Sequence, residues 1–341
     1  MIDDRAINEY VNNDKYRRAL KLPKEPACEY FPLAQGEYNA NYYFVHPTDG
    51  KKLVLRVNHG SQMHLDNQIE YEAHALKLMQ ESPRTPVVYY VDGSASTPGN
   101  GILVMEHLPG RELNYEDWDE MSEAAACLAD IHSIEMPENH GLIAPEDSLR
   151  AILDECEEML AVYMESDIPD NAAKTRLRIL LDSAWKLLEG MSVEDTYRCC
   201  INTELNSTNF LVDNGYVRLV DWEKPLYGDP AQDLGHFLAP TTTFWKTDVV
   251  LDEGEMDRFI DSYIEKVDGR FDVSGLKERV YEFVTITCLR GITWCAMAWV
   301  QYQDRDKSLF NESTWIKLNQ YLGDEFLSRI ERILQSYEIN M

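Results

Sequence analysis

The sequence predicts a bilobal α+β fold, with a small β-rich N-terminal lobe and a larger, mostly helical C-terminal lobe. Its 341 residues are more than one compact core of ordinary size holds. The first third of the chain alternates between apolar and polar side chains as strands do, around one helical stretch. After Pro109-Gly110, apolar residues recur at helical spacing over long stretches. We therefore expect the lobes at 1–107 and 108–341.

The N-terminal lobe is predicted to hold a hairpin, one helix and two further strands. Residues 42–45 and 52–57 alternate as two strands around a Pro-Thr-Asp-Gly turn. From 66 to 80, apolar side chains fall three and four residues apart, which indicates a helix, and prolines end it. Short apolar strands at 87–91 and 102–105 complete the lobe.

The C-terminal lobe is predicted to be helical on both sides of a short alternating region. Helices are expected at about 119–133, 148–165 and 171–188. A strand-loop-strand segment follows at 198–222, and the remaining chain is predicted to be helical. Sequence-based boundaries of this kind carry errors of a few residues.

The charge balance is strongly acidic. The chain has 32 Lys and Arg against 60 Asp and Glu, a formal charge of −28. Such a surface repels nucleic-acid backbones and anionic membrane faces, so neither is an expected partner. The acidity fits either a solvated surface or attraction of a cationic substrate, and charge alone does not separate these two interpretations.

The cysteines and the N-terminus indicate a cytoplasmic protein. There are seven cysteines, an odd number with no Cys-x-x-Cys pair, which favours reduced, buried thiols over disulfides or a zinc site. The N-terminus is polar and acidic, unlike a signal peptide. The longest apolar stretch, around 292–300, is shorter than the roughly 20 residues that span a bilayer. The sequence does not indicate an oligomeric state.

Three oxygen-bearing side chains mark the segment predicted to carry chemistry. Glu204 and Asn209 lie five residues apart in a polar loop, and strands at 210–212 and 216–220 follow around an Asp-Asn-Gly turn. The hairpin brings Asp221 back beside Asn209. Mg²⁺ takes a few protein oxygens, with phosphate and water oxygens completing its octahedron. A carboxylate not bound to metal can accept the proton of a substrate hydroxyl.

This segment resembles the aminoglycoside phosphotransferase and choline kinase superfamily, relatives of the protein kinases. The family's catalytic loop usually reads His-Gly-Asp-x-x-x-x-Asn, and a metal-binding Asp follows the next hairpin. The run DWE…GDP..DL at 221–234 is also similar to the family's pattern. The resemblance implies a protein-kinase-like fold that binds ATP and Mg²⁺. It implies Asn209 and Asp221 as metal ligands and Glu204 as the catalytic base.

The resemblance extends to the expected nucleotide-binding lobe. The strand LVLRV resembles the one that carries the phosphate-contacting cation, which makes Arg56 that cation. The helix EYEAHAL resembles the one whose Glu pairs with the cation. Glu72 is the predicted partner, and Glu70 is the alternative.

Two further nucleotide-binding segments follow from the resemblance. Residues 101–110 resemble the hinge that receives adenine on backbone groups, which implicates Glu106 and Leu108. Residues 33–39 stand where the phosphate-covering loop should be, with Gly36 as their single glycine. No Walker-type Gly-x-x-x-x-Gly-Lys-Ser/Thr motif occurs in the chain.

The catalytic loop departs from the family pattern at two positions. Asn202 stands in place of the family His, and Glu204 in place of the family Asp. Glu reaches further by one C–C bond, about 1.5 Å, and a misplacement of that size can cost about a hundredfold in rate unless something compensates. Asp233 is expected to brace this loop.

Three hypotheses therefore stand. The first is an ATP- and Mg-dependent kinase that acts on a hydroxyl of a small, cationic molecule such as an amino sugar, an amino alcohol or a choline-like compound. The second is a nucleotide-binding pseudokinase that regulates or scaffolds a partner. The third is nucleotidyl transfer from the same fold. The sequence names neither the acceptor nor a preference for ATP over GTP.

Overall fold

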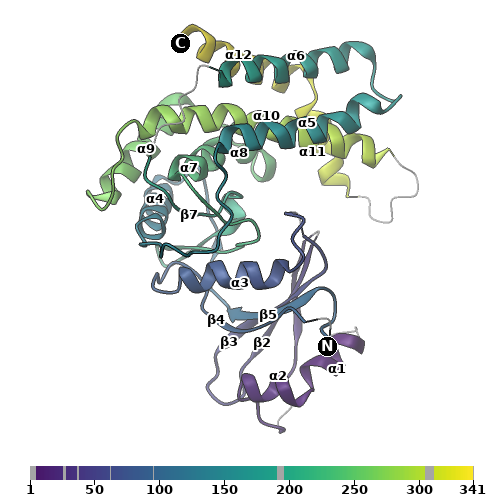
Figure 1. Cartoon of the computed structure of the whole chain (residues 1–341), viewed down its shortest axis with the longest axis vertical. Coiled ribbons are helices and arrows are strands. Elements are labelled where there is room, and N and C mark those ends of the chain that lie inside the picture. The colour runs from purple at the N-terminus through teal and green to yellow at the C-terminus, as the bar shows by residue number, and fades with distance from the viewer. Residues whose placement is uncertain are drawn as a thin grey trace. The chain divides into compact units, whose positions relative to one another are not determined.

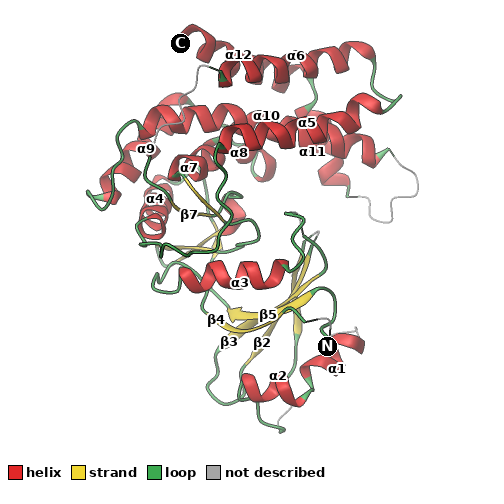
Figure 2. Cartoon of the chain, in the orientation of Figure 1, coloured by secondary structure: helices red, strands yellow, loops and turns green. Residues whose placement is uncertain are grey.

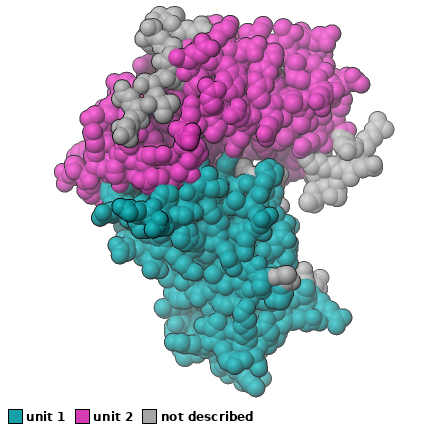
Figure 3. All heavy atoms as spheres, in the orientation of Figure 1, with its two compact units in different colours: residues 1–143, 208–226 teal, residues 144–207, 227–341 magenta. Residues whose placement is uncertain are grey.

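The computed structural model divides into two compact units (Figure 3). It describes residues 5–25, 28–36, 38–61, 63–94, 96–189, 196–303 and 311–340. The first unit comprises residues 1–143 and 208–226, and the second comprises 144–207 and 227–341.

The two units do not coincide with the lobes expected from the sequence at 1–107 and 108–341. Residues 108–143 and the hairpin segment 208–226 group with the N-terminal sheet by their contacts. The lobe boundary at residue 107 stays a prediction, and each unit is described below by itself.

A five-stranded antiparallel sheet forms the base of the first unit, in the order β1-β2-β3-β5-β4. Its strands are β1 (Phe31–Gln35), β2 (Asn39–Val45), β3 (Lys52–Asn58), β4 (Val88–Asp92) and β5 (Gly101–Glu106). The four strands predicted for the N-terminal lobe, at 42–45, 52–57, 87–91 and 102–105, are confirmed to within a few residues. Strand β1 was not predicted, because all five of its side chains are exposed and show no alternation in burial.

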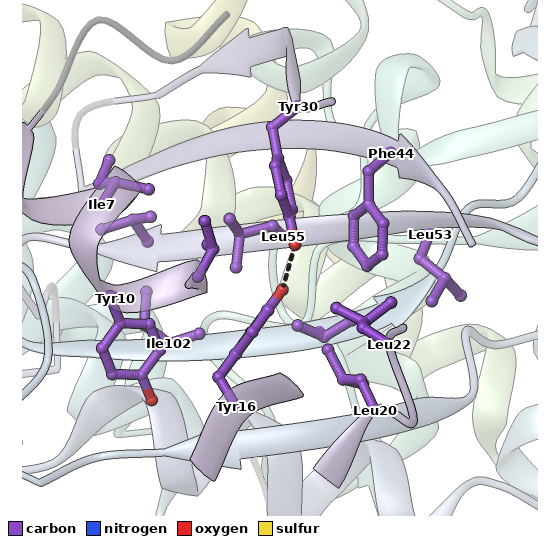
Figure 4. Packing of buried hydrophobic residues seen from close by; sticks show 13 residues of the cluster. Ile7, Tyr10, Tyr16, Leu20, Leu22, Tyr30, Phe44, Leu53, Leu55 and Ile102 are labelled. Carbon is purple, nitrogen blue, oxygen red and sulfur yellow. Dashed lines mark hydrogen bonds between the residues drawn. The ribbon is translucent and has the colours of Figure 1, made fainter. Parts of the chain in front are cut away.

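Two short helices, α1 (Arg5–Val11) and α2 (Asp14–Ala19), cover one face of this sheet. Figure 4 shows their apolar side chains packed on alternate residues of β3 and its neighbours. The Tyr30 hydroxyl donates to the Tyr16 hydroxyl at 3.2 Å inside this cluster. The cluster comprises Ile7, Tyr10, Val11, Tyr16, Leu20, Leu22, Tyr30, Phe44, Leu53, Leu55, Val57, Ile102 and Val104.

Helix α3 (Gln68–Leu78) packs on the sheet at β4 and β5 (Figure 1). Asn67 caps its N-terminus by accepting from the backbone N–H of Glu70. Ile69, Ala73 and Leu76, the residues whose spacing predicted the helix, are all buried. Side chains alternate across a strand, so Arg56 of β3 points away from the face that Leu55 shares with α1 and α2, and it contacts Glu72 of α3.

The remainder of the first unit is a three-stranded sheet in the order β6-β8-β9 with one helix against it. The elements are β6 (Arg111–Glu112), β8 (Phe210–Asp213), β9 (Tyr216–Leu219) and α4 (Trp118–His132). The predicted hairpin is confirmed. Its turn needs left-handed backbone at two positions, and φ is +51° at Asn214 and +78° at Gly215.

The second unit is mainly helical, as Figure 2 shows. The helices α5 (Ser148–Glu165) and α6 (Asn171–Leu188) match the predicted ranges. Helix α10 (Leu276–Tyr302) contacts both of them. Its other elements are β7 (Cys199–Ile201), α7 (Pro230–Leu238), α8 (Pro240–Lys246), α9 (Glu253–Val267), α11 (Glu312–Tyr321) and α12 (Asp324–Asn340). Two short elements, η1 (Ser207–Asn209) and β10 (Leu226–Gly228), have residues in both units.

Helix α10 is long and apolar enough to cross a membrane by length and composition, and 67% of its most apolar window is buried within the structure. Such burial is what the core helix of a folded domain shows. The seven cysteines are all unpaired, as predicted, and burial raises the pKa of each thiol.

Candidate active site

Arg56 is the centre of an ion cluster in the first unit. Its Nη1 lies 2.5 Å from Oε1 of Glu72, and its Nη2 lies 3.1 Å from Oδ1 of Asp221. A third carboxylate, Oε1 of Glu223, lies 3.8 Å from Nη1. Asn41 of β2 accepts from Arg56 Nε at 3.0 Å. The predicted pairing of Arg56 with Glu72 is therefore present in the structure.

The cluster is charged and largely removed from water. Arg56 is 5% exposed and Glu72 is 1% exposed. Burial alone would lower the pKa of the Arg56 guanidinium, but the charges of Glu72, Asp221 and Glu223 raise it above its ordinary value. Burial and the neighbouring Asp221 charge raise the pKa of Glu223 to about 8, against the opposing effect of Arg56.

Glu223 is also fixed to the strands and to α3. The Asn39 side chain of β2 donates to its carboxylate, and Gln68 of α3 donates to its backbone carbonyl at 2.6 Å. Tyr71 of α3 donates to the carbonyl of Pro225 at 2.7 Å. The chain after Asp221 is thus held against the N-terminal sheet by side chains from two separate elements.

Asn209 and Asp221 lie at the same end of the β8–β9 hairpin. The backbone N–H of Val220 donates to the carbonyl of Asn209 at 2.9 Å, which places the next residue, Asp221, beside the start of β8. Asp221 has a φ of +64°, a left-handed conformation that costs a non-glycine residue of order 1 kcal/mol. Its side chain is 38% exposed and so remains accessible.

The chemistry of these two side chains fits a hard cation. An amide oxygen and a carboxylate supply two of the oxygen ligands that Mg²⁺ prefers, and phosphate and water oxygens would supply the rest. In the described part of the chain, no group of three or more His, Cys, Asp or Glu side chains could hold a metal by itself.

Glu204 lies in the second unit, in the loop after β7. Asp233 of α7 accepts from the backbone N–H groups of Asn202 and Thr203 at 2.8 and 2.7 Å, so the expected brace is present. The side-chain oxygen of Asn202 accepts from the backbone N–H of Glu204 at 3.1 Å. Asn202 thus supplies a hydrogen bond that orders the loop. Thr203 takes a left-handed φ of +68° between them.

The carboxylate of Glu204 faces a cation that sequence reasoning missed. Oε1 of Glu204 lies 3.6 Å from Nη2 of Arg290, on α10. The Glu204 side chain is 27% exposed, which leaves it open to a substrate. The signal for Arg290 was visible in the sequence, because it is the one charged residue in the apolar segment 283–300 of this helix.

The predicted hinge is the end of β5 and the residues after it. The backbone N–H of Glu106 donates to Val87 at 2.8 Å, and that of His107 donates to Lys52 at 3.2 Å, so the segment is tied to two neighbouring chain segments. Leu108 is buried. Nearby, the Tyr43 ring lies 6.5 Å from the His107 ring.

Gly36 stands in the turn between β1 and β2. Its backbone N–H donates to the carbonyl of Asn39 at 2.9 Å. The segment expected as a phosphate-covering loop is therefore partly strand, because residues 33–35 belong to β1.

The first unit thus brings together Arg56, Glu72 and Asp221 by direct contact, and Asn209 by the adjacent backbone hydrogen bond. Glu204 belongs to the second unit. The assignments of Glu204, Gly36, Arg56, Glu72, Glu106, Leu108, Asn209 and Asp221 to catalysis, nucleotide or metal binding stay predictions. The structure adds Glu223 and Arg290 to the residues of the candidate site.

A sequence-family model described as a phosphotransferase enzyme family matches residues 29–269, more than two thirds of the chain. A comparison with curated protein sequences finds no match.

Solved structures share the fold. The choline kinase of Cryptosporidium parvum aligns with a TM-score of 0.67 at 13% identity, over 94% of this chain and 95% of that one. The ethanolamine kinase of Plasmodium vivax aligns with a TM-score of 0.63 at 16% sequence identity, over 96% of each chain. A spectinomycin phosphotransferase in complex with ADP and spectinomycin aligns with a TM-score of 0.60 at 12% sequence identity, over 91% of this chain and 93% of that one. The predicted protein-kinase-like α+β class is confirmed.

Proposed function

We propose, from the premise that this chain belongs to the phosphotransferase enzyme family, that it transfers the γ-phosphoryl group of Mg·ATP to a hydroxyl of a small molecule. That it is a small-molecule kinase follows from the family; the donor, the metal and the acceptor are the proposal. The observation that carries it is the buried Arg56–Glu72 pair in contact with Asp221. A cation held by one carboxylate beside a second, more exposed carboxylate suits binding of a nucleotide and its metal.

Each residue of the first unit has a separate role in this proposal. Arg56, oriented by Glu72, binds phosphate oxygens of the nucleotide. Asn209 and Asp221 hold Mg²⁺, which when bound neutralises charge on the phosphates. Glu106 and Leu108 receive the adenine on backbone groups, and Gly36 lies in the turn that covers the phosphates. Catalysis by this set is mostly positioning and charge stabilisation.

Glu204 acts on the acceptor. Its carboxylate accepts a hydrogen bond from the acceptor hydroxyl and takes its proton as the phosphoryl group is transferred. The side chains of Asn202 and Asp233 accept hydrogen bonds from backbone N–H groups of this loop and so hold its backbone in place.

A cationic acceptor fits the charge of the chain. The formal charge is −28, which attracts amines to the surface and repels nucleic acids and anionic membranes. The structural relatives include a choline kinase, an ethanolamine kinase and a spectinomycin phosphotransferase. We therefore propose an amino alcohol, an amino sugar or a choline-like compound as the acceptor, and a cytoplasmic location for the enzyme.

The test is an ATP-consumption screen against amino sugars, amino alcohols and nucleosides, with Asp221→Ala and Glu204→Gln as controls. Asp221→Ala is expected to abolish turnover because it removes a metal ligand. Glu204→Gln is expected to lower kcat by about 10²–10⁴-fold, the usual contribution of a general base, and to leave Mg·ATP binding intact.

Three results would contradict the proposal. Unchanged turnover in Asp221→Ala excludes the metal assignment. Tight Mg·ATP binding with no turnover of any acceptor favours the pseudokinase. A product carrying a nucleotidyl group in place of a phosphoryl group, read by mass spectrometry, favours nucleotidyl transfer.

A further inference from the structure

Helix α10 carries one charged side chain in the middle of a buried apolar segment. Its neighbours Leu289 and Ile292 are each 1% exposed, and Arg290 stands between them with a side chain that is 19% exposed. Removing a guanidinium from water costs several kcal/mol unless carboxylates and hydrogen bonds compensate for it. A cation retained at such a place needs a partner.

Arg290 has two carboxylate partners from different elements. Its Nε donates to Oε2 of Glu155, on α5, at 2.8 Å. Its Nη2 lies 3.6 Å from Oε1 of Glu204, in the loop after β7. Burial alone would lower the pKa of Arg290, but the charges of Glu155 and Glu204 raise it. Because the guanidinium is planar and rigid, fixing one edge on Glu155 also fixes the edge that faces Glu204.

The backbone of α10 next to Arg290 is fixed by close packing against α8. Gly291 packs against α8 so closely that an added Cβ would lie 2.5 Å from Cβ of Thr241. Thr241 also donates to the carbonyl of Thr287, one turn earlier on α10, at 3.3 Å. Backbone packing therefore fixes the Cα position of Arg290, and the hydrogen bond to Glu155 fixes its guanidinium.

The Glu204 side chain loses more conformational freedom than an Asp side chain would when it is held in one orientation. Its backbone is braced by Asn202 and Asp233, but its side chain has one more rotatable bond than Asp, and restricting it costs conformational entropy. A base displaced by about 1 Å can lose about a hundredfold in rate. A fixed cation beside the carboxylate selects one direction for it before the acceptor arrives.

We propose that Arg290 is the positioning residue of the catalytic base: held by Glu155, it directs the Glu204 carboxylate toward the acceptor hydroxyl. This inference rests on the proposed function. Arg290 acts through Glu204, whose carboxylate it faces, and it is not among the residues proposed to bind the nucleotide. Its loss should therefore lower kcat without changing nucleotide binding.

The test compares Arg290→Met, Arg290→Lys and the double variant Arg290→Met/Glu155→Gln in the full-length chain. We measure kcat and KM with the acceptor found by the screen, and Mg·ATP affinity by calorimetry. The double variant removes both charges of the Arg290–Glu155 pair, so it does not leave the Glu155 carboxylate without the cation that it contacts. Both Met variants are expected to lose kcat by about 10–100-fold with unchanged ATP affinity, and Lys is expected to recover part of the loss.

Two controls separate positioning from a general effect on the fold. Arg178→Met breaks a similar ion pair, 2.7 Å from Glu157 of the same helix α5, and should leave kcat unchanged. In a Glu204→Gln background, Arg290→Met should have little further effect on kcat, because the carboxylate that it positions is absent.

If kcat of the Arg290→Met/Glu155→Gln variant lies within twofold of the parent value, the inference is overturned. It is also overturned if Arg290→Met lowers kcat by the same factor in the parent and in the Glu204→Gln background. A parent chain that turns over no acceptor overturns the proposed function and this role with it. A parent that turns over with a kcat independent of Arg290 overturns the positioning role alone.

Discussion

At the scale of single residues, the most constrained group in the first unit is the guanidinium of Arg56. Three carboxylates, those of Glu72, Asp221 and Glu223, lie within 4 Å of it. Of these, only Glu72 lies outside the segment after β9, and it is the most buried. Glu72 therefore fixes the cation from the helix side through Nη1, which Glu223 also approaches, while Asp221 contacts Nη2.

Glu72→Gln tests this arrangement. Without the charge of Glu72, Arg56 is expected to turn further toward Asp221 and Glu223 and away from phosphate oxygens. We expect Mg·ATP affinity to fall by about tenfold, or about 1.4 kcal/mol, in a calorimetric titration. The matched control is Glu70→Gln, on the exposed side of the same helix. An equal loss of affinity in both variants would assign the effect to α3 as a whole.

The residue contacts also show what the sequence could not predict. Arg56 and Glu72 were predictable because the strand LVLRV and the helix EYEAHAL that carry them resemble the corresponding segments of the family. Glu223 follows Asp221 by two residues, yet its role depends on Asn39, which is 184 residues away in the chain. Arg290 depends in the same way on Glu155 and Glu204. Long-range polar contacts leave no periodicity, so neither residue was predicted to be functional.

At the scale of elements, α1 and α2 are attached to the sheet by a polar contact as well as by their apolar faces. Asp92, at the end of β4, accepts from Lys15 of α2 at 2.8 Å and from Tyr10 of α1 at 2.7 Å. Burial would raise the pKa of Asp92, but the hydrogen bonds from Lys15, Tyr10 and Ser94 hold it well below its ordinary value. Asp92 thus ties two helices to the end of one strand.

This contact predicts a pH dependence of stability. The folded-state pKa of Asp92 lies below the unfolded value of about 3.9, so its contribution is present at neutral pH and is lost as pH falls below about 4. Asp92→Asn should lower the unfolding free energy at pH 7 and make its decline toward pH 3 shallower, measured by urea denaturation. Glu9→Gln, which breaks an exposed pair with Arg5, should change stability by at most about 1 kcal/mol. If the unfolding free energy of Asp92→Asn falls with pH as steeply as that of the parent, the pH dependence does not come from Asp92.

Long, strongly periodic elements were the ones that the sequence could define. Helices α5 and α6 carry continuous apolar stripes, and their predicted ends coincide with those observed. Helices α1 and α2 have seven and six residues, fewer than two full turns, so no stripe could be recognised. They are stable because they pack on the sheet, since helices this short are marginal alone.

At the scale of the whole molecule, the dominant electrostatic feature is the formal charge of −28. Like charges on a compact body repel one another, and dissolved salt screens that repulsion over a distance of about 10 Å at 0.1 M. We expect the melting temperature to rise steadily between about 0.01 and 0.3 M salt, over which the screening length falls severalfold, and to rise equally in NaCl and KCl. A melting temperature independent of ionic strength would show that the acidic groups are already compensated within the fold.

The division into units has a consequence for how the protein is made. The chain leaves the first unit after residue 143 and returns to it at residue 208. On a translating ribosome, the sheet, α3 and α4 emerge without β8 and β9, the strands that follow Asn209 and lead to Asp221. The nascent N-terminal segment therefore exposes the surface that this hairpin covers until residues 208–226 have been synthesised. During that interval, the segment is a candidate client of chaperones that bind apolar surface.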